Sequence, residues 1–463
     1  MKYFRLVGVV VASAALVGGA LPASATPSGS STIGAPGLGD PFFPNAGNGG
    51  YDTDHYDLRL EWDPTSGELS GTAIIDAKAT QDLSQFNLDF RGFEITSLKV
   101  NGSKAAFTRD GQELVISPQT LIRRRDDMKI KVSYHGVPTT VIDPDGAVDG
   151  WIPTPGGVVA LSEPQGAPSW YPVNDYPTDK ATYSIAMTVP KALSAISNGR
   201  LESKETEGAK TTWRWEAEQP MASYLTTMAI GTFTVTSGKT ASGLPFVNAV
   251  EPKLVADSAA AIARTDEILT WEKGLFGRYP FDTVGVIAVD APDVGYALET
   301  QTRPVFTTAV DESTYVHELA HQWIGDSLSL TTFPEMWLNE GFAQYTEKLW
   351  AEKEGTATAQ SWFDEVYALP ASDPFWTVAP AALPGPEEQF GRAVYERGAM
   401  TLHTLRTTVG DATFFRILRT WVSQNRGGNV TTKQFIALSE KLSGKSLNQL
   451  FDAWLFTPGK PTR

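Results

Sequence analysis

The chain of 463 residues contains no cysteine. It therefore has no disulfide and no lipid-modified cysteine, and a bound metal must use nitrogen or oxygen ligands. Histidine is scarce as well, with five residues in the whole sequence. A metal site built from imidazoles therefore has few candidate positions.

Positive charge is in deficit, because 38 Lys and Arg face 53 Asp and Glu, for a net charge of −15. Nucleic acids and anionic membrane surfaces select basic proteins, so the sequence argues against either as a partner. The acid excess mildly favours a cationic ligand, although an ordinary soluble acidic surface is the better explanation. The hydrophobic content of 41% excludes wholesale disorder. At roughly 150 residues per domain, the length predicts two or three domains.

Long apolar runs are missing, except near the start of the chain. Lys2 and Arg5 precede an uncharged stretch, residues 6–21, and a small-residue segment ends at Ala25. This pattern predicts a secretory signal peptide over residues 1–25, because the apolar run is shorter than the roughly 20 residues of a membrane span. We expect a secreted, extracellular protein after cleavage near Ala25. The mature chain is expected to contain no membrane span.

Composition then divides the rest of the chain. Residues 26–50 are rich in Gly, Pro, Ser and Asn, which predicts a flexible tether. Short runs of alternating polar and apolar residues follow, and Asn101-Gly102 is a hairpin-turn signal. They predict an antiparallel β domain over residues 51–238, with strands within 55–62, 71–75, 129–134, 182–189 and 211–215.

The second half has apolar residues at helical spacing and predicts a mainly helical domain over residues 239–463. One buried strand is expected at 284–289. The expected helices lie within 257–275, 314–324, 337–353, 399–409 and 432–450. The fold class is therefore α+β and multidomain, with the β domain first.

Two of the five histidines form His317-Glu318-Leu319-Ala320-His321. Residues four apart share one face of a helix, so both imidazoles reach one ion, and neutral imidazole suits zinc. The intervening Glu318 is the usual general base for a metal-bound water. A catalytic zinc needs a third protein ligand. Glu340, 19 residues after His321 in the next expected helix, supplies a carboxylate if the two helices run antiparallel.

These two segments, residues 317–323 and 337–343, resemble those of the aminopeptidase N family of gluzincin metallopeptidases, which includes leukotriene hydrolase. The resemblance covers about residues 51–461. It implies an N-terminal β domain followed by a thermolysin-like catalytic domain. It also implies one Zn²⁺ per chain, held by His317, His321 and Glu340, with Glu318 as base.

The resemblance extends to residues that contact the substrate. Residues 394–399 resemble the family's Tyr-Glu-Lys-Gly segment, so Tyr395 is expected to stabilise the carbonyl oxygen, with Arg397 in place of the lysine. Residues 296–300 match the family's amine-binding loop at Ala297 and Glu299, although Tyr296, Leu298 and Thr300 depart from it. Residues 171–181 resemble a β-domain segment that places Glu163 near the substrate amine.

The leading interpretation is therefore a secreted zinc aminopeptidase acting on peptides with a free N-terminus. A zinc hydrolase of another specificity, either an endopeptidase or an epoxide hydrolase, is the nearest alternative. Retention of Glu299 favours exopeptidase action over it. A catalytically dead binding protein on the same scaffold is the other alternative. Such a protein is expected to lose a ligand, the base or the tyrosine, and all of these are present.

Overall fold

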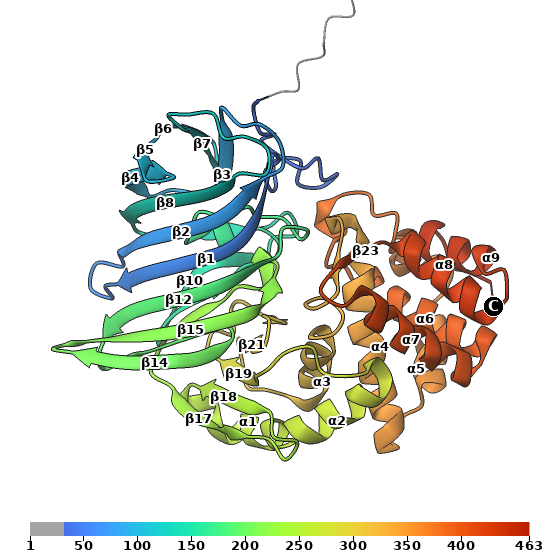
Figure 1. Cartoon of the computed structure of the whole chain (residues 1–463). Helices are drawn as coiled ribbons and strands as arrows, with labels where there is room; N and C mark the ends of the chain where they lie inside the picture. Colours follow the sequence, from blue (N-terminus) through green and yellow to red (C-terminus); the bar gives the residue numbers. More distant parts are fainter. Residues whose placement is uncertain (1–31, 463) are drawn as a thin grey trace, which may run out of the picture. The chain divides into compact units, whose positions relative to one another are not determined.

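The structure is a computed structural model that describes residues 32–462 (Figure 1). The predicted signal peptide, residues 1–25, and the first part of the predicted tether lie outside the described residues. The described residues belong to one compact unit. Within the described part, no helix has the length and apolar character needed to cross a membrane.

The first half of the described chain is a β domain built on an eight-stranded sheet (Figure 1). All neighbouring strands in this sheet are antiparallel except β1 and β12, which pair in parallel. In spatial order the strands are β14 (Arg200–Glu207), β15 (Lys210–Met221), β12 (Ala181–Pro190), β1 (Tyr51–Trp62), β2 (Leu69–Ala79), β8 (Asp127–Gly136), β4 (Glu94–Val100) and β5 (Ser103–Lys104).

Alternating burial explains why these segments form strands. Along β12, Tyr183, Ile185 and Met187 are buried while the residues between them are partly exposed. Successive side chains of a strand point to opposite faces, so this pattern gives the sheet one apolar face. That face contributes to a core shared with a second sheet, in the order β13 (Ser194–Ser197), β16 (Met228–Gly231), β11 (Gly157–Leu161), β10 (Val148–Thr154) and β9 (Thr140–Ile142).

The predicted turn at Asn101-Gly102 joins β4 to β5, and both residues have positive φ, 50° and 81°. Such a turn favours Asn and Gly, which tolerate this backbone region. A third, three-stranded sheet completes the β domain. Its strands are β3 (Phe86–Asp89), β7 (Glu113–Ser117) and β6 (Ala106–Asp110).

Residues 32–50 are not the flexible tether that the composition predicted. The Asp40 carboxylate is buried and accepts a hydrogen bond from the backbone N–H of Phe42 through one oxygen. Its other oxygen accepts from the Tyr176 hydroxyl and from the Phe333 N–H of the helical domain. The prediction was wrong because Gly and Pro permit tight turns as readily as disorder, and here buried polar anchors hold the turns in place.

The helical domain contains a five-stranded sheet, and its first strand lies across the predicted boundary at residue 238. Strand β17 (Thr234–Lys239) pairs with β18 (Pro245–Val250), so the Gly and Ser residues nearby belong to a hairpin and not to a linker. The sheet order is β17, β18, β19 (Val284–Ala288), β21 (Val305–Phe306) and β20 (Ala297–Leu298). A two-stranded sheet joins β22 (Ser329–Leu330) to β23 (Asn429–Val430).

Helices form the remainder of this domain, and they include two that the sequence did not predict, α5 and α7. The single helix expected over 257–275 is divided at Arg264 into α1 and α2. The described helices are α1 (Val255–Ala263), α2 (Thr265–Phe276), α3 (Glu312–His321), α4 (Trp337–Glu354), α5 (Ala359–Tyr367), α6 (Gly398–Val409), α7 (Asp411–Asn425), α8 (Thr432–Ser443) and α9 (Asn448–Phe451).

Candidate active site

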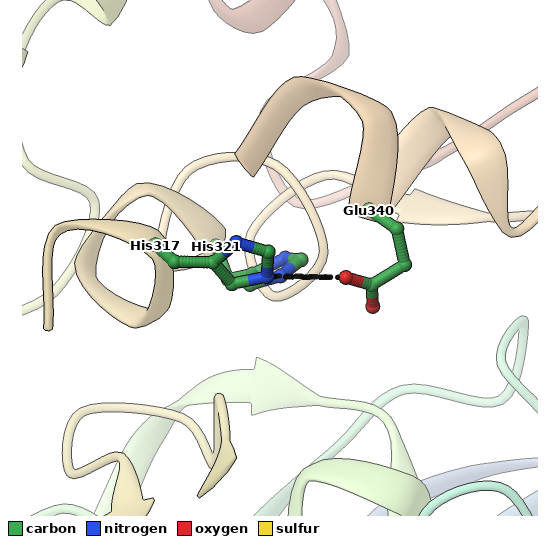
Figure 2. Close-up of side chains that lie close together, drawn as sticks. All are labelled: His317, His321 and Glu340. Atoms are coloured by element: carbon green, nitrogen blue, oxygen red, sulfur yellow. Dashed lines mark hydrogen bonds and ion pairs between the residues drawn. The ribbon is translucent and has the colours of Figure 1, made fainter. Parts of the chain in front are cut away.

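Helices α3 and α4 bring three metal-binding side chains together (Figure 2). Helix α3 begins after Asp311, whose side chain accepts a hydrogen bond from the backbone N–H of Thr314 at 3.0 Å. His317 and His321 then lie one turn apart, with 3.0 Å between their Nε2 atoms. Oε2 of Glu340, in the first turn of α4, lies 3.1 Å from His317 Nε2 and 3.5 Å from His321 Nε2.

The partners of the two imidazoles show that this group suits a cation. Nδ1 of His321 donates to the Ile324 carbonyl at 3.0 Å, and Nδ1 of His317 donates to the Glu347 carboxylate at 2.8 Å. When Nδ1 carries the proton of a neutral imidazole, Nε2 presents a lone pair. Two lone pairs and a carboxylate oxygen therefore face one point, and only a cation relieves their mutual repulsion.

The spacing of the three atoms suits zinc. Donors bound at about 2.0–2.1 Å in a tetrahedron lie roughly 3.3 Å apart, which matches the separations between these atoms. The set of two imidazoles and one carboxylate leaves a fourth position open, as a catalytic zinc requires. Burial raises the pKa of Glu340, but the charges and hydrogen bonds of His321 and His317 together outweigh this effect and lower that pKa to about 2. The carboxylate is therefore ionised and able to bind the metal.

The ligands open into a cavity of about 390 Å³. All eight residues that the sequence predicted for the site line this one cavity. They are Glu163, Ala297, Glu299, His317, Glu318, His321, Glu340 and Tyr395. Because Glu163 belongs to the β domain and the others to the helical domain, both domains build the site.

Glu318 and Tyr395 lie beside the metal ligands with unused polar atoms. Oε2 of Glu318 is buried without a hydrogen-bond partner. Burial raises the pKa of Glu318 to about 8, against the lowering effect of His317 and His321. The Tyr395 ring stacks on the His317 ring at 6.1 Å between centroids. No described residue forms a hydrogen bond with the Tyr395 hydroxyl, so it is available to a ligand.

Glu299 and Glu163 form a second group of buried carboxylates. Glu299 is 3% exposed and Glu163 is 5% exposed, and Oε1 of each has no hydrogen-bond partner. The backbone carbonyl of Glu299 accepts from Nε2 of Gln322 at 3.1 Å, which ties its loop to the end of α3. Burial, followed by the charge of Glu299, raises the pKa of Glu163. No described Lys or Arg pairs with either carboxylate, and the imidazole nitrogen beside Glu299, His321 Nδ1 at 3.9 Å, donates its proton to Ile324. The two carboxylates therefore favour a positively charged ligand.

Sequence analysis missed Glu347, the carboxylate that orients His317. Its signal was present, because Glu347 follows Glu340 by two helical turns and so shares its face of α4. It also missed Lys180, whose ammonium group donates to the backbone carbonyls of Asp326, Ser327 and Gly428. Nothing local in the sequence predicts this contact between the β domain and the loop after α3.

Arg397 was noticed only as a departure from lysine. Its side chain is fully buried and follows Tyr395 in the π-helical turn Ala393–Arg397. All five guanidinium N–H groups donate to backbone carbonyls, those of Trp376, Val378, Ala453, Trp454 and Thr457. Arg397 therefore fixes the turn that carries Tyr395 to two distant segments of the chain.

Helices α3 and α4 carry two histidines and a glutamate that bind zinc, and the β domain lines part of the same cavity. This combination defines a gluzincin-type metallopeptidase. Residues 52–225 match the Peptidase M1 N-terminal domain, and residues 271–454 match the Peptidase family M1 domain. The chain belongs to peptidase family M1. Its cofactor is zinc, and the predicted order of a β-rich domain and a helical catalytic domain is confirmed.

Solved structures of the family are similar over most of the chain. An M1 zinc metallopeptidase from Deinococcus radiodurans is 29% identical with a TM-score of 0.83, covering 92% of this chain and 99% of that chain. A variant of a two-domain M1 zinc metallopeptidase bound to L-arginine has the same identity and coverage, with a TM-score of 0.85.

Longer relatives match as well. Glutamyl aminopeptidase of Rattus norvegicus is 26% identical over 457 residues, which are 88% of this chain and 47% of the relative. Aminopeptidase M1 of Arabidopsis thaliana is 23% identical over 449 residues, 88% of this chain and 50% of the relative. The chain thus spans half or less of the length of these curated relatives.

Proposed function

We propose that this chain is a zinc aminopeptidase that removes the first residue from peptides with a free N-terminus. One observation carries the proposal. Glu163 and Glu299 are buried carboxylates that pair with no described Lys or Arg, and they line the same cavity as the zinc ligands. A substrate α-ammonium group would pair with both in a partly dry site, where charge-assisted hydrogen bonds are strong. The aminopeptidase names of several relatives support the same activity.

Zinc held by His317, His321 and Glu340 would supply Lewis acidity, which polarises a carbonyl and lowers the pKa of water. Glu318 accepts a proton from the attacking water and returns it to the departing amine. The Tyr395 hydroxyl donates to the carbonyl oxygen as negative charge develops there.

Substrate position follows from the short strand β20. Ala297 and Leu298 pair with β21, so the cavity wall that precedes Glu299 is held by the sheet. The substrate's first residue lies along this wall, with its ammonium group at Glu299 and Glu163. This arrangement places the first peptide bond, and not a later one, beside the zinc ligands. It therefore favours exopeptidase over endopeptidase action, and the comparisons favour neither an epoxide hydrolase nor an inactive binding protein.

A matched pair of peptides, one with a free amine and one N-acetylated, tests the proposal. Glu299→Ala is expected to lower kcat/KM for the free peptide by roughly 10- to 150-fold, because it removes a charge-assisted hydrogen bond. Slow cleavage of the acetylated peptide should be nearly unchanged. Glu365→Ala, at an exposed position of α5, is the control for an equal change of net charge. A tight chelator should abolish activity, and zinc should restore it.

Two outcomes would contradict the proposal. Wild-type protein that cleaves the acetylated peptide as fast as the free one would be an endopeptidase. An equal loss on both peptides in Glu299→Ala would mean that Glu299 supports the loop or the metal site and does not bind the amine.

We also propose that the protein is exported. The support is the charged start, the short apolar run and the small residues ending at Ala25. Protein recovered outside the cell should begin near Thr26 when its N-terminus is sequenced. Protein that stays inside the cell with residues 1–25 intact would refute this proposal.

A further inference from the structure

Two carboxylates of the cavity have no part in the chemistry described above. Asp143 and Asp145 lie in the loop between β9 and β10, and both line the cavity. Asp145 closes its own turn, because Oδ1 accepts from the Ala147 N–H at 2.9 Å. Asp143 is only 8% exposed, yet its carboxylate forms no hydrogen bond or ion pair with any described residue. A largely buried carboxylate that faces a cavity and has no protein partner is available to a ligand.

The charge of the cavity indicates which ligand. Seven carboxylates and no lysine or arginine line it, counting the described residues. Five of the seven have a role already: Glu340 as metal ligand, Glu318 as base, Glu163 and Glu299 at the amine site, and Glu347 as the partner of His317. Asp143 and Asp145 remain. Burial and then the charge of Asp145 raise the pKa of Asp143 to about 7, while Arg91 acts in the opposite direction without forming an ion pair. The pair therefore lacks a counter-cation.

The loop that holds Asp143 is attached to the segment that holds the amine site. The Asp143 N–H donates to the Ala147 carbonyl at 2.9 Å, which places Asp143 beside the first residue of β10, Val148. The Tyr296 hydroxyl donates to the Val148 carbonyl at 2.9 Å. Glu299 follows Tyr296 by three residues, a distance of at most about 11 Å in extended chain. Asp143 and Glu299 also line the same cavity of about 390 Å³, so a substrate residue held at Glu299 shares that space with the Asp143 carboxylate.

We propose that the site selects peptides whose first residue carries a cationic side chain, arginine or lysine, and that Asp143 is the specificity-determining residue. This inference rests on the proposed aminopeptidase function. The planar guanidinium of arginine matches a carboxylate best, because it donates two parallel hydrogen bonds. An N-terminal glutamate is repelled by the same carboxylates. The substrate stated in the name of the glutamyl aminopeptidases is accordingly not the one expected here.

The test compares peptides that begin with arginine or with citrulline, which has the same shape without the charge. At pH 8, where Asp143 is mostly ionised, wild-type kcat/KM should be at least tenfold higher for arginine, or about 1.4 kcal/mol. Asp143→Asn should remove most of that preference by slowing arginine cleavage, with citrulline cleavage unchanged within about twofold. Asp143→Glu should restore part of it. Asp54→Asn, at an exposed position of β1, controls for the change in net charge.

Equal cleavage of the arginine and citrulline peptides by the wild-type protein would overturn the inference, and this comparison needs no variant. An equal loss on both peptides in Asp143→Asn would overturn it as well, because Asp143 would then merely support the loop. A peptide beginning with leucine separates the two proposals. If the wild type cleaves it without preferring arginine over citrulline, the inference alone fails. If the wild type cleaves no peptide with a free amine, the proposed function fails.

Discussion

At the scale of single residues, each zinc histidine is oriented from the side of its ring that faces away from the metal. His321 uses a backbone carbonyl for this, whereas His317 uses the carboxylate of Glu347. A carboxylate partner also makes the opposite nitrogen more basic and so strengthens its bond to the metal. Glu347 is itself held by the hydroxyl of Ser313 at 3.0 Å and by the ammonium group of Lys348 at 3.1 Å.

Glu347→Gln should therefore weaken zinc binding by roughly 10- to 100-fold, the usual cost of losing such a partner. Competition with a chromogenic zinc chelator measures the affinity directly, without relying on activity. Glu354→Gln, near the exposed end of the same helix, is the matched control and should bind zinc like the wild type. Unchanged affinity in Glu347→Gln would show that His317 needs no carboxylate partner.

At the scale of elements, the π-helical turn Ala393–Arg397 decides where Tyr395 lies. Helix α6, which continues this turn, approaches α4 closely, and a Cβ atom on Gly341 would lie 3.0 Å from Cα of Gly398. A larger residue at this position would push the two helices apart, so glycine brings the turn against the helix of the third zinc ligand. Arg397 then fixes the turn from its other side through five backbone carbonyls. A lysine has three donors, so at least two of these five hydrogen bonds cannot form.

Arg397→Lys should consequently lower both the melting temperature and kcat. A buried carbonyl that is left without a donor costs about 1–3 kcal/mol, and the loosened turn misplaces the Tyr395 hydroxyl. For Arg397→Lys we expect about a tenfold loss in kcat with little change in KM. Tyr395→Phe removes the hydroxyl altogether and should lower kcat by roughly 100-fold. Zinc content should be unchanged in both variants.

Arg392→Lys is the control, because Arg392 lies next to the same turn and its guanidinium pairs with Glu396 near the surface. A rise in KM with kcat preserved in Arg397→Lys would mean that the turn shapes substrate binding and does not position Tyr395.

At the scale of the whole molecule, the β domain forms part of the active site. It supplies Glu163 and Asp143 to the cavity. It also holds the loop that follows α3, through the Lys180 ammonium group and through the Tyr224 hydroxyl, which donates to the Gly325 carbonyl at 2.6 Å. The helical domain by itself would lose these donors, and the loop beside His321 would be exposed to water.

The buried acids of the β domain make stability depend on pH. Burial raises the pKa of Asp175 to about 7, despite a hydrogen bond from the Ser223 hydroxyl at 2.6 Å. Between about pH 4 and pH 7 the folded state therefore holds a proton that the unfolded state has lost. The contribution of Asp175 to the free energy of unfolding is therefore complete below pH 4. It is lost as the pH rises to 7, at about 1.4 kcal/mol per pH unit.

Asp175→Asn removes this titration, so its stability relative to the wild type should increase from pH 4 to pH 7 and then level off. The cost of burying the amide does not depend on pH. The change with pH in the stability difference between variant and wild type is therefore informative even if the variant is less stable at every pH. Denaturant or thermal unfolding at several pH values measures this difference. The exposed Asp54→Asn is the control, and a flat difference between Asp175→Asn and wild type would refute the prediction.

The sequence by itself determined whatever depends on neighbours along the chain. Alternation gave the strands of the large sheet, helical spacing placed His317 and His321 on one face, and Asn101-Gly102 marked a turn that the structure contains. The third ligand, Glu340, could also be predicted from the sequence, because the prediction required only that the next helix run antiparallel to the first. These features follow from the periodicity of helices and strands, which the order of residues contains directly.

Only the tertiary structure decided what depends on contacts between distant segments. Composition predicted a flexible tether over the Gly- and Pro-rich residues 32–50, but in the structure this segment is packed. The reason is that Asp40 accepts hydrogen bonds from both domains. The tertiary structure also placed Asp143 of the β domain in the same cavity as the zinc ligands. A buried carboxylate and an exposed one look alike in a sequence. Their chemistry differs because folding removes water from one of them and decides whether any cation takes its place.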